Sequence, residues 1–352
     1  MKREVKLDSP HERAEASVAV PALSVIIAAD RYETIRQTVR HLRAQARREQ
    51  LELVIVTESG DALALDGAET DGFCRVQVVE VPAIFPLALA TSAGVRRATA
   101  PLVVLAESHA FPAPGWAEAL IEAHRQPCAA VGAVIGNANP GIISWANLFV
   151  DYGRCVETAS PESATYLPGH HTCYKREILL QYDAQLDEVM DSEILLHWDM
   201  RAKGHELRIE PAARVYHVNV SSLTAWLPQR FYTGRRFAAT RSRDWPLWKR
   251  VLCFGGSPLI PLVRVPRVCG DLSGSTFPRS RWPLILPAIV VGLVAGAAGE
   301  MAGYLLGGGN AVLETARMEL FKVQFVTERE RRKLEAWSAD VTRHTAREPP
   351  EV

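Results

Sequence analysis

A carboxylate and an imidazole stand two residues apart in the stretch AESHAFPAPGW, at Glu107 and His109. The apolar run LVVLA precedes them and a proline-rich turn follows, so both side chains fall where a buried strand is predicted to end. A carboxylate oxygen and an imidazole nitrogen together suit Mn²⁺ or Mg²⁺ when diphosphate oxygens complete the ligand set. The alternative is a helix-capping residue beside a solvent-facing histidine.

Two further carboxylates fall at the ends of predicted strands. Asp30 ends the β-branched run at residues 22–30, and Glu58 ends the run at residues 51–58. Both runs are continuous and apolar, which is typical of strands that are buried on both faces. In parallel α/β sheets, ligands bind at the carboxyl ends of the strands. The sequence therefore predicts that Asp30, Glu58 and Glu107 point into one crevice.

The order of the predicted elements indicates an α/β fold with a mostly parallel sheet and crossover helices. Periodicity weakens over residues 137–176, where a loop-rich segment is expected. A helix is predicted over residues 191–203, followed by a short strand, a turn and a second strand over 205–218. The earlier strands are predicted at 22–30, 51–58, 74–82 and 101–107, and the earlier helices at 32–48 and 86–98.

Composition excludes some classes of protein. The chain has 352 residues, and its 40 basic and 40 acidic side chains cancel, so the net charge predicts no nucleic-acid partner. Six scattered cysteines form no CxxC pair, which argues against a zinc site or a disulfide framework. The polar N-terminus lacks the apolar core of a signal peptide, so any catalytic part is expected to face the cytosol.

The last third of the chain changes character. Residues 231–281 are basic and carry tryptophans, which suits an anionic membrane surface, although a solvated face is the alternative. Residues 283–299 are uncharged and long enough to span a bilayer, and a hairpin, an interfacial insertion and a buried helix of a soluble protein are the alternatives. Residues 251–263 are too short to span, so a re-entrant or interfacial segment is expected. Two GxxxG spacings, Gly292/Gly296 and Gly299/Gly303, suit close helix packing in lipid and would permit a homo-oligomer.

Three stretches together resemble the nucleotide-binding half of family-2 glycosyltransferases with the GT-A fold. They read LSVIIAADRYETIRQTVRHLRAQ, LELVIVTESGD and AESHAFPAPGWAEAL. In that family the third stretch carries a DxD signature followed by PxPGW. Glu107 and His109 take the two aspartate positions, which leaves one negative charge fewer. The resemblance implies a GT-A, Rossmann-like sheet flanked by helices, and a divalent cation whose binding is weak or optional.

Later motifs are similar to the same family in the same order. The stretch DSEILLHWDMRAKGHEL resembles the family's acidic catalytic helix and places Glu193 at the general-base position, with Asp191 as the second candidate. The stretch GHHTCYKREIL resembles the acceptor-side loop and brings in His170. The resemblance also implies that His217, in EPAARVYHVNVSS, approaches the metal or the diphosphate.

The resemblance assigns the remaining site residues. Arg235 and Arg236, in QRFYTGRRF, match a basic segment that lies over the diphosphate, with phospholipid contact or a solvated face as alternatives. Asp30 sits where the family recognises the nucleobase, and Glu58 lies near the family's second-strand aspartates. The alternative for Glu193 is an ordinary first-turn glutamate favoured by the helix dipole. A histidine such as His170 is otherwise polar surface.

These observations lead to one main hypothesis, an inverting glycosyltransferase at the membrane that uses a nucleotide-sugar donor and a lipid-linked or cell-envelope polysaccharide acceptor. A catalytically degenerate GT-A scaffold is the alternative, because the DxD signature is missing and Ser192 stands where the family's catalytic helix usually has a glutamate. A nucleotidyltransferase is disfavoured, since AADRYET lacks a glycine-rich basic loop after the first strand. The predicted parts are a disordered tail (1–20), a GT-A domain (21–240), a hydrophobic and amphipathic membrane-associated region (241–335) and a polar tail (336–352).

Overall fold

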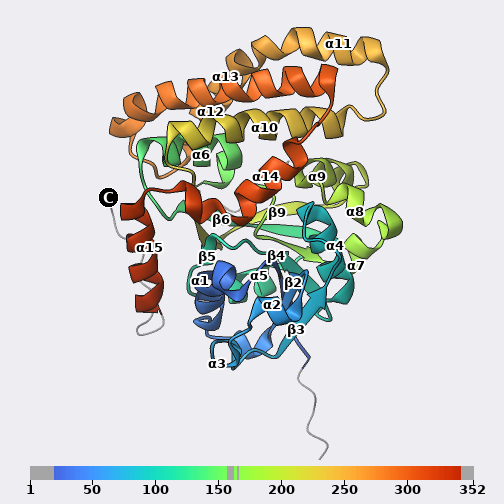
Figure 1. Cartoon of the computed structure of the whole chain (residues 1–352), viewed down its shortest axis with the longest axis vertical. Helices are drawn as coiled ribbons and strands as arrows, with labels where there is room; N and C mark the ends of the chain where they lie inside the picture. The colour runs from blue at the N-terminus through green and yellow to red at the C-terminus, as the bar shows by residue number, and fades with distance from the viewer. Residues whose placement is uncertain (1–19, 157–161, 165, 342–352) are drawn as a thin grey trace, which may run out of the picture.

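The protein, shown in Figure 1 as a computed structural model, is described over residues 20–156, 162–164 and 166–341. Within these residues, nine strands form one sheet in the order β3-β2-β1-β4-β8-β6-β9-β5, with β7 paired to β9. Long helices gather at one end of the molecule, above the sheet in Figure 1. The predicted tail at 1–20 lies outside the described residues except for its last position.

The first half of the sheet is parallel and is built from apolar, β-branched runs. In β1 and β2 the side chains are almost all buried, as expected for strands covered on both faces. Helices α1 (Tyr32–Arg43) and α4 (Leu87–Arg97) connect the strands. These strands are β1 (Leu23–Ala28), β2 (Leu51–Thr57), β3 (Arg75–Glu80) and β4 (Leu102–Leu105).

The second half of the sheet is mixed. Strand β8 lies antiparallel between β4 and β6, and β9 runs parallel to β6. Strand β5 pairs antiparallel with β9, which brings the turn before β5 close to the end of β9. These strands are β5 (Ala110–Pro112), β6 (Ala130–Asn137), β7 (Glu162–Ser163), β8 (Thr172–Lys175) and β9 (Leu207–His217).

The predicted α/β fold with flanking helices is confirmed, and two local predictions are wrong. Helix α6 (Ile142–Tyr152) lies within the segment expected to be loop-rich, because its apolar side chains, including Phe149, are buried. Strand β9 is continuous where a strand, turn and strand were expected, because a shift in its pairing with β6 accommodates the irregular stretch around Pro211.

Short helices connect the remaining strands. Helix α9 begins at Glu193, within the predicted range 191–203. The short α-helices are α2 (Gly60–Leu63), α3 (Gly67–Thr70), α5 (Trp116–Ala123), α7 (Arg176–Leu180), α8 (Leu186–Val189) and α9 (Glu193–Ala202), and the 3₁₀ turns are η1 (Arg48–Gln50), η2 (Gly153–Cys155) and η3 (Asp183–Gln185).

Helices α10 to α13 form a layer at the end of the molecule that Figure 1 shows at the top. Two stretches, Leu247–Gly274 and Arg279–Leu306, are long and apolar enough to cross a membrane by length and composition. Each is helical nearly throughout, so neither the short segment at 251–263 nor a hairpin in α13 is observed. The layer contains α10 (Leu223–Arg241), α11 (Leu247–Gly256), η4 (Ser257–Leu259), α12 (Ile260–Gly274), η5 (Arg279–Arg281) and α13 (Trp282–Leu306).

The glycines of the GxxxG spacings pack α13 against α10 of the same chain. A Cβ at Gly299 would lie 2.0 Å from the carbonyl oxygen of Phe231, and one at Gly303 would lie 2.4 Å from that of Arg235. Gly234 of α10 faces Gly296 in the same way, with 2.2 Å between its Cβ position and the Gly296 oxygen. The spacing therefore serves a contact within one chain, and it gives no support to the predicted homo-oligomer.

The C-terminal segment returns from the helical layer to the sheet. Helix α14 (Ala311–Leu320) and the turn η6 (Lys322–Phe325) run back toward the strands, and α15 (Glu328–Val341) packs beside α1 (Figure 1). Trp337 of α15 is buried against the rings of His41 and Phe111. The helix therefore extends past residue 336, where a polar tail was expected to begin, because this tryptophan joins a hydrophobic cluster.

Candidate functional site

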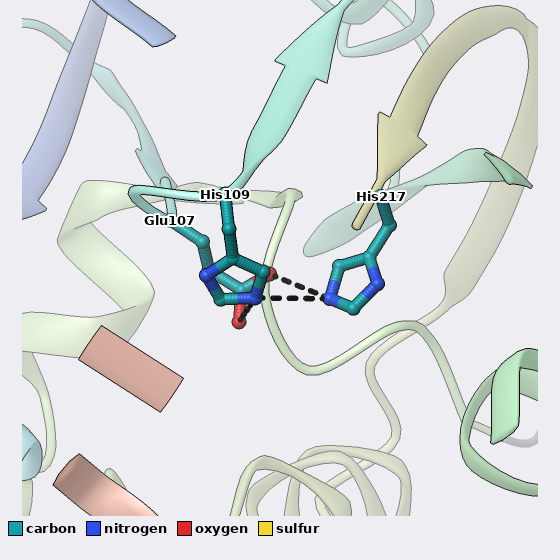
Figure 2. A group of neighbouring side chains, drawn as sticks. All are labelled: Glu107, His109 and His217. Atoms are coloured by element: carbon teal, nitrogen blue, oxygen red, sulfur yellow. Dashed lines mark hydrogen bonds and ion pairs between the residues drawn. The ribbon is translucent and has the colours of Figure 1, made fainter. Parts of the chain in front are cut away.

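A carboxylate and two imidazoles meet at the edge of the sheet, as Figure 2 shows. Glu107 and His109 lie in the turn between β4 and β5, and His217 is the last residue of β9, paired with Ala110 of β5. His109 Nε2 lies 3.6 Å from Glu107 Oε1 and 3.1 Å from His217 Nε2, and His217 Nε2 lies 3.5 Å from Glu107 Oε2. All three side chains are buried. The pairing of β5 with β9 thus brings together side chains that are more than a hundred residues apart in sequence.

The orientation of His217 is fixed by a neighbouring amide. Asn219 donates through Nδ2 to the oxygens of Asn137 and His217, so its Oδ1 is left to accept from His217 Nδ1 at 2.9 Å. Nε2 is then the unprotonated nitrogen, and it faces Glu107. Burial is the main reason why the pKa of His217 falls to about 3, so the ring is neutral at physiological pH.

Glu107 is a buried carboxylate surrounded by histidines. His170 Nδ1 lies 3.2 Å from Oε1, and His171 Nε2 lies 3.4 Å from Oε2. Burial alone would raise the pKa of Glu107, but the neighbouring imidazoles, His170 first, outweigh it and hold that pKa well below its ordinary value. Burial lowers the pKa of His170, but Glu107, Glu193 and Glu319 outweigh it and raise that pKa.

This donor set fits a divalent cation. Neither carboxylate oxygen of Glu107 has a hydrogen-bond partner with good geometry among the described residues, although both are buried. One ligand atom each from Glu107, His109 and His217 lies within 4.8 Å of the others. The hydrogen bond from His217 to Asn219 is the kind of outer contact that orients a metal-binding imidazole. Two nitrogens and one carboxylate suit Mn²⁺ better than Mg²⁺, which prefers oxygen ligands.

A second carboxylate, Glu193, shares a cavity of about 170 Å³ with Glu107. Glu193 is the first residue of α9, where a negatively charged side chain interacts favourably with the helix dipole. His170 lies between the two carboxylates, with Nε2 3.6 Å from Glu193 Oε1. Gly169 leaves room for Glu193, because a Cβ at that glycine would lie 3.1 Å from Oε2. The cavity therefore joins a metal-competent cluster to a carboxylate that can accept a proton.

The predicted residues divide between the cavity and its surroundings. Asp191 and Arg236 line the cavity with Glu107, His170 and Glu193. Asp191, in the turn before α9, accepts a hydrogen bond from Thr240 of α10 at 2.8 Å. The turn before α9 therefore meets α10 at this wall of the cavity.

Five predicted residues are not among those that line this cavity: His109 and His217, which lie beside Glu107 in the cluster, and Asp30, Glu58 and Arg235. Asp30 accepts hydrogen bonds from Thr34 and Arg31 at the start of α1. Glu58 accepts from the backbone of Ile84, and Arg235 donates to the carbonyl of Gly307 at 2.9 Å. The expected convergence of Asp30, Glu58 and Glu107 in one crevice is therefore not observed at this cavity. The reason is that the carboxylate of Asp30 is engaged at the start of α1 and that of Glu58 by the loop between β3 and α4.

Two functional candidates come from a segment that sequence analysis did not consider. Lys322 of η6 lines the cavity and is 2% exposed, and its Nζ lies 2.5 Å from Glu319 Oε2. Glu319 Oε2 also lies 3.7 Å from His109 Nε2. Burial lowers the pKa of Lys322, but Glu319 and Glu107 outweigh it and raise that pKa, so the ammonium is charged. A single lysine in an amphipathic C-terminal segment gives no sequence signal that its side chain is buried in this cavity.

Comparison with known proteins gives matches of two kinds, one to a family and one to curated proteins. Residues 24–182 match the family described as Glycosyl transferase family 2. This range includes Glu107, His109 and His170, and it ends before Glu193 and His217. Two curated proteins from two strains of Mycobacterium tuberculosis, both named Pre-mycofactocin glycosyltransferase, are 26% identical over 192 residues. That match covers 51% of this chain and 40% of each relative, so the chain spans less than half the length of these relatives.

Proposed function

We propose that this protein transfers a sugar from a nucleotide-sugar donor to an acceptor hydroxyl, with inversion, because residues 24–182 match the family described as Glycosyl transferase family 2. The observation that carries the proposal is the single cavity shared by Glu107 and Glu193. Glu107 in the wall of that cavity belongs to a cluster suited to a cation beside a diphosphate. Glu193 in the same wall is a carboxylate at the start of a helix.

Glu193 is the proposed general base. It takes the proton of the acceptor hydroxyl while the hydroxyl oxygen forms a bond to the anomeric carbon. The bond from that carbon to the diphosphate breaks on the opposite side, and its electron pair leaves with the nucleoside diphosphate. Asp191 lines the same cavity but accepts a hydrogen bond from Thr240, which leaves Glu193 as the better placed carboxylate.

Positive charge on the leaving-group side supports the same proposal. Lys322 and Arg236 line the cavity, and an ammonium or guanidinium there stabilises the charge that develops on the diphosphate. Glu107, His109 and His217 would hold a divalent cation, which supplies Lewis-acid stabilisation of the leaving group when bound. Asp30 and Glu58 stay proposed contacts for the nucleoside, and Arg235 for the diphosphate.

We further propose that the protein works at a membrane, with its sheet domain on the cytoplasmic side and a lipid-linked or cell-envelope glycan as acceptor. The support is the pair of apolar helical stretches, Leu247–Gly274 and Arg279–Leu306. Exposed apolar side chains on these stretches, such as Trp248 at 69% and Leu262 at 71%, suit contact with lipid.

The first test is calorimetric titration of the purified full chain with UDP and with GDP, in Mn²⁺, in Mg²⁺ and without metal. We expect one nucleotide to bind in Mn²⁺, and the affinity to fall at least tenfold in the double variant Glu107→Ala, His109→Ala. The control is Glu122→Ala, which removes an exposed carboxylate paired with Arg125. Binding of neither nucleotide, or equal binding in the double variant, would contradict the cluster's role and favour the degenerate scaffold.

The base is tested by Glu193→Gln, which keeps the shape of the side chain and removes its ability to accept a proton. We expect transfer to the acceptor to fall by about a hundredfold to ten-thousandfold while nucleotide affinity is kept, since this is the usual contribution of a general base. Transfer at the wild-type rate by Glu193→Gln would rule out the assignment.

A further inference from the structure

A second, larger cavity of about 710 Å³ lies between the sheet domain and the helical layer. Its walls come from α6, α9, α10, α11, α12 and α13, and they are mainly apolar. Phe149, Trp198 and Phe237 contribute aromatic rings, and Ile260 and Val263 contribute aliphatic side chains. A volume of this size is in the range that binds a whole small ligand or a lipid chain.

The inner end of this apolar cavity reaches the proposed base. Asp151, Tyr166 and Ile194 line both the apolar cavity and the cavity of Glu107 and Glu193. Ile194 directly follows Glu193 in α9. A ligand that fills the apolar cavity can therefore extend a polar end past these three residues to the Glu193 carboxylate.

The outer end of the apolar cavity opens on an apolar surface. Leu252, Leu259 and Val263 line the cavity and are still 66%, 58% and 51% exposed. They belong to the stretch Leu247–Gly274, which is long and apolar enough to cross a membrane. The same surface continues over further exposed apolar side chains, which are Leu247, Trp248, Val251, Leu262, Leu284, Val290, Val291 and Val294. Such a mouth admits an apolar chain from lipid more readily than a hydrated glycan from water.

Charge in the apolar cavity is balanced. Its charged lining residues are three arginines and three carboxylates, so it carries no net charge that would select an ionic ligand. Asp151 is already paired with Arg230, and Arg264 donates to the carbonyl of Val150 at 3.1 Å. A free sugar would leave its hydroxyls without partners against the apolar walls, which is unfavourable. The lining residues concerned are Arg241, Arg264, Arg267, Asp151, Asp271 and Glu300.

We propose that this cavity holds the apolar chain of a membrane lipid whose hydroxyl-bearing head group is the sugar acceptor. The proposal rests on the glycosyltransferase function above, and it names the class of acceptor for the same site. The chain enters between Leu252, Leu259 and Val263, and the head group passes Ile194 to reach Glu193. The hydroxyl then loses its proton to Glu193 as described for the transfer.

Two glycines of α11 provide a matched test. Gly256 lines the cavity and Gly255 does not, and a Cβ at either position has open space around it. The full-length variants Gly256→Phe and Gly255→Phe would be compared with wild type for binding of pyrene-labelled dodecanol below its micelle concentration, followed by fluorescence. We expect Gly256→Phe to weaken binding at least tenfold and Gly255→Phe to leave it unchanged. Val263→Trp and Leu262→Trp form a second pair, because Val263 lines the cavity and Leu262 faces outward.

Nucleotide binding in Mn²⁺ separates this proposal from the glycosyltransferase function. Intact nucleotide binding with equal dodecanol binding in wild type and Gly256→Phe would overturn the lipid cavity and leave the transferase proposal standing. Equal loss in Gly256→Phe and Gly255→Phe would place the probe on the outer helix surface and would also overturn it. Loss of dodecanol binding only in Gly256→Phe, with nucleotide bound by none of the proteins, would support the cavity while the transferase proposal fails.

Discussion

At Glu107 a carboxylate is surrounded by imidazoles rather than by a second carboxylate. A cation held by Glu107, His109 and His217 keeps more of its positive charge than one held by two aspartates, because only one of its protein ligands is anionic. Such a site is expected to bind the free cation more weakly and to attract a diphosphate more strongly than a site with two aspartates. This residue-level difference predicts that metal and nucleotide bind cooperatively.

Lys322 adds a fixed positive charge that does not depend on metal. Its ammonium is buried between Glu319 and the cavity. We expect Lys322→Met to weaken binding of the preferred nucleoside diphosphate in Mn²⁺ by about tenfold to a hundredfold, the usual loss when a charge-assisted hydrogen bond is removed. Calorimetric titration of wild type and Lys322→Met with the same nucleotide measures this loss of affinity.

Lys203→Met is the matched control for Lys322→Met. Lys203 also pairs with a carboxylate on its own helical turn, Asp199 at 2.6 Å, but it is half exposed and does not line the cavity. Equal nucleotide affinity in Lys322→Met and wild type would show that the lysine only supports the local fold of η6.

At the scale of elements, the helix pair α10 and α13 depends on glycine. A Cβ at Gly299 would lie 2.0 Å from the Phe231 oxygen and 3.0 Å from the Arg235 nitrogen, both backbone atoms. We expect Gly299→Ala to force the helices apart and to lower the free energy of unfolding by about 1–3 kcal/mol, the usual penalty for overpacking. The thermal unfolding midpoint in detergent measures the change.

Gly270→Ala in α12 is the control for this packing. A Cβ there meets nothing within 4 Å, so the substitution only improves helix propensity and is expected to stabilise the protein by about 0.5–1 kcal/mol. If both variants change the midpoint in the same direction by similar amounts, the close approach of α10 and α13 does not limit stability.

The strands that hold the first half of the sheet were predictable from local sequence. Runs such as those of β1 and β2 are continuous, apolar and β-branched, and this pattern is typical of strands that are buried on both faces. Helix α6 was missed because its apolar residues are spread over most of its surface, so that no regular stripe marks it. The continuity of β9 was missed because its pairing shift with β6 is a tertiary feature that Pro211 conceals.

The site was predictable where its residues follow an element end. Glu107, His109 and Glu193 each stand at a boundary between a strand or helix and a turn, and the structure brings all three to one region. Lys322 and Glu319 were not predictable, because their position depends on α14 returning from the helical layer (Figure 1). No spacing within the chain encodes that return.

At the scale of the whole molecule, the site depends on parts that are far apart in sequence. The sheet domain supplies Glu107 and His170, α9 supplies Glu193, and the segment beyond the helical layer supplies Glu319 and Lys322. Besides its proposed contact with lipid, the helical layer positions the C-terminal wall of the cavity. This arrangement couples the global stability of the fold to the geometry of the site.

Buried histidines make that global stability depend on pH, and three of them lie away from Glu107 and its neighbouring imidazoles. Burial lowers the pKa of His41 and His124 to about 4 and that of His197 to about 3. The backbone N–H of Leu167 donates to Nδ1 of His197 at 3.3 Å. A proton on Nδ1 would place a second N–H group against that of Leu167, which disfavours the charged ring. The unfolded chain takes up these protons near pH 6.5, whereas the folded protein does not until about pH 4.

The free energy of unfolding is therefore expected to fall as the pH drops from about 6.5 toward 4. The unfolded state binds more protons throughout this window, so the slope is positive with pH and amounts to at most about 1.4 kcal/mol per pH unit for each histidine. Urea unfolding at pH 7.0, 6.0 and 5.0 measures it above the range where most carboxylates titrate. His124→Gln should reduce the slope by at most about 1.4 kcal/mol per pH unit, because one of the contributing imidazoles is gone. A stability that stays flat or rises between pH 6.5 and 5 would mean that these histidines are already protonated in the folded protein.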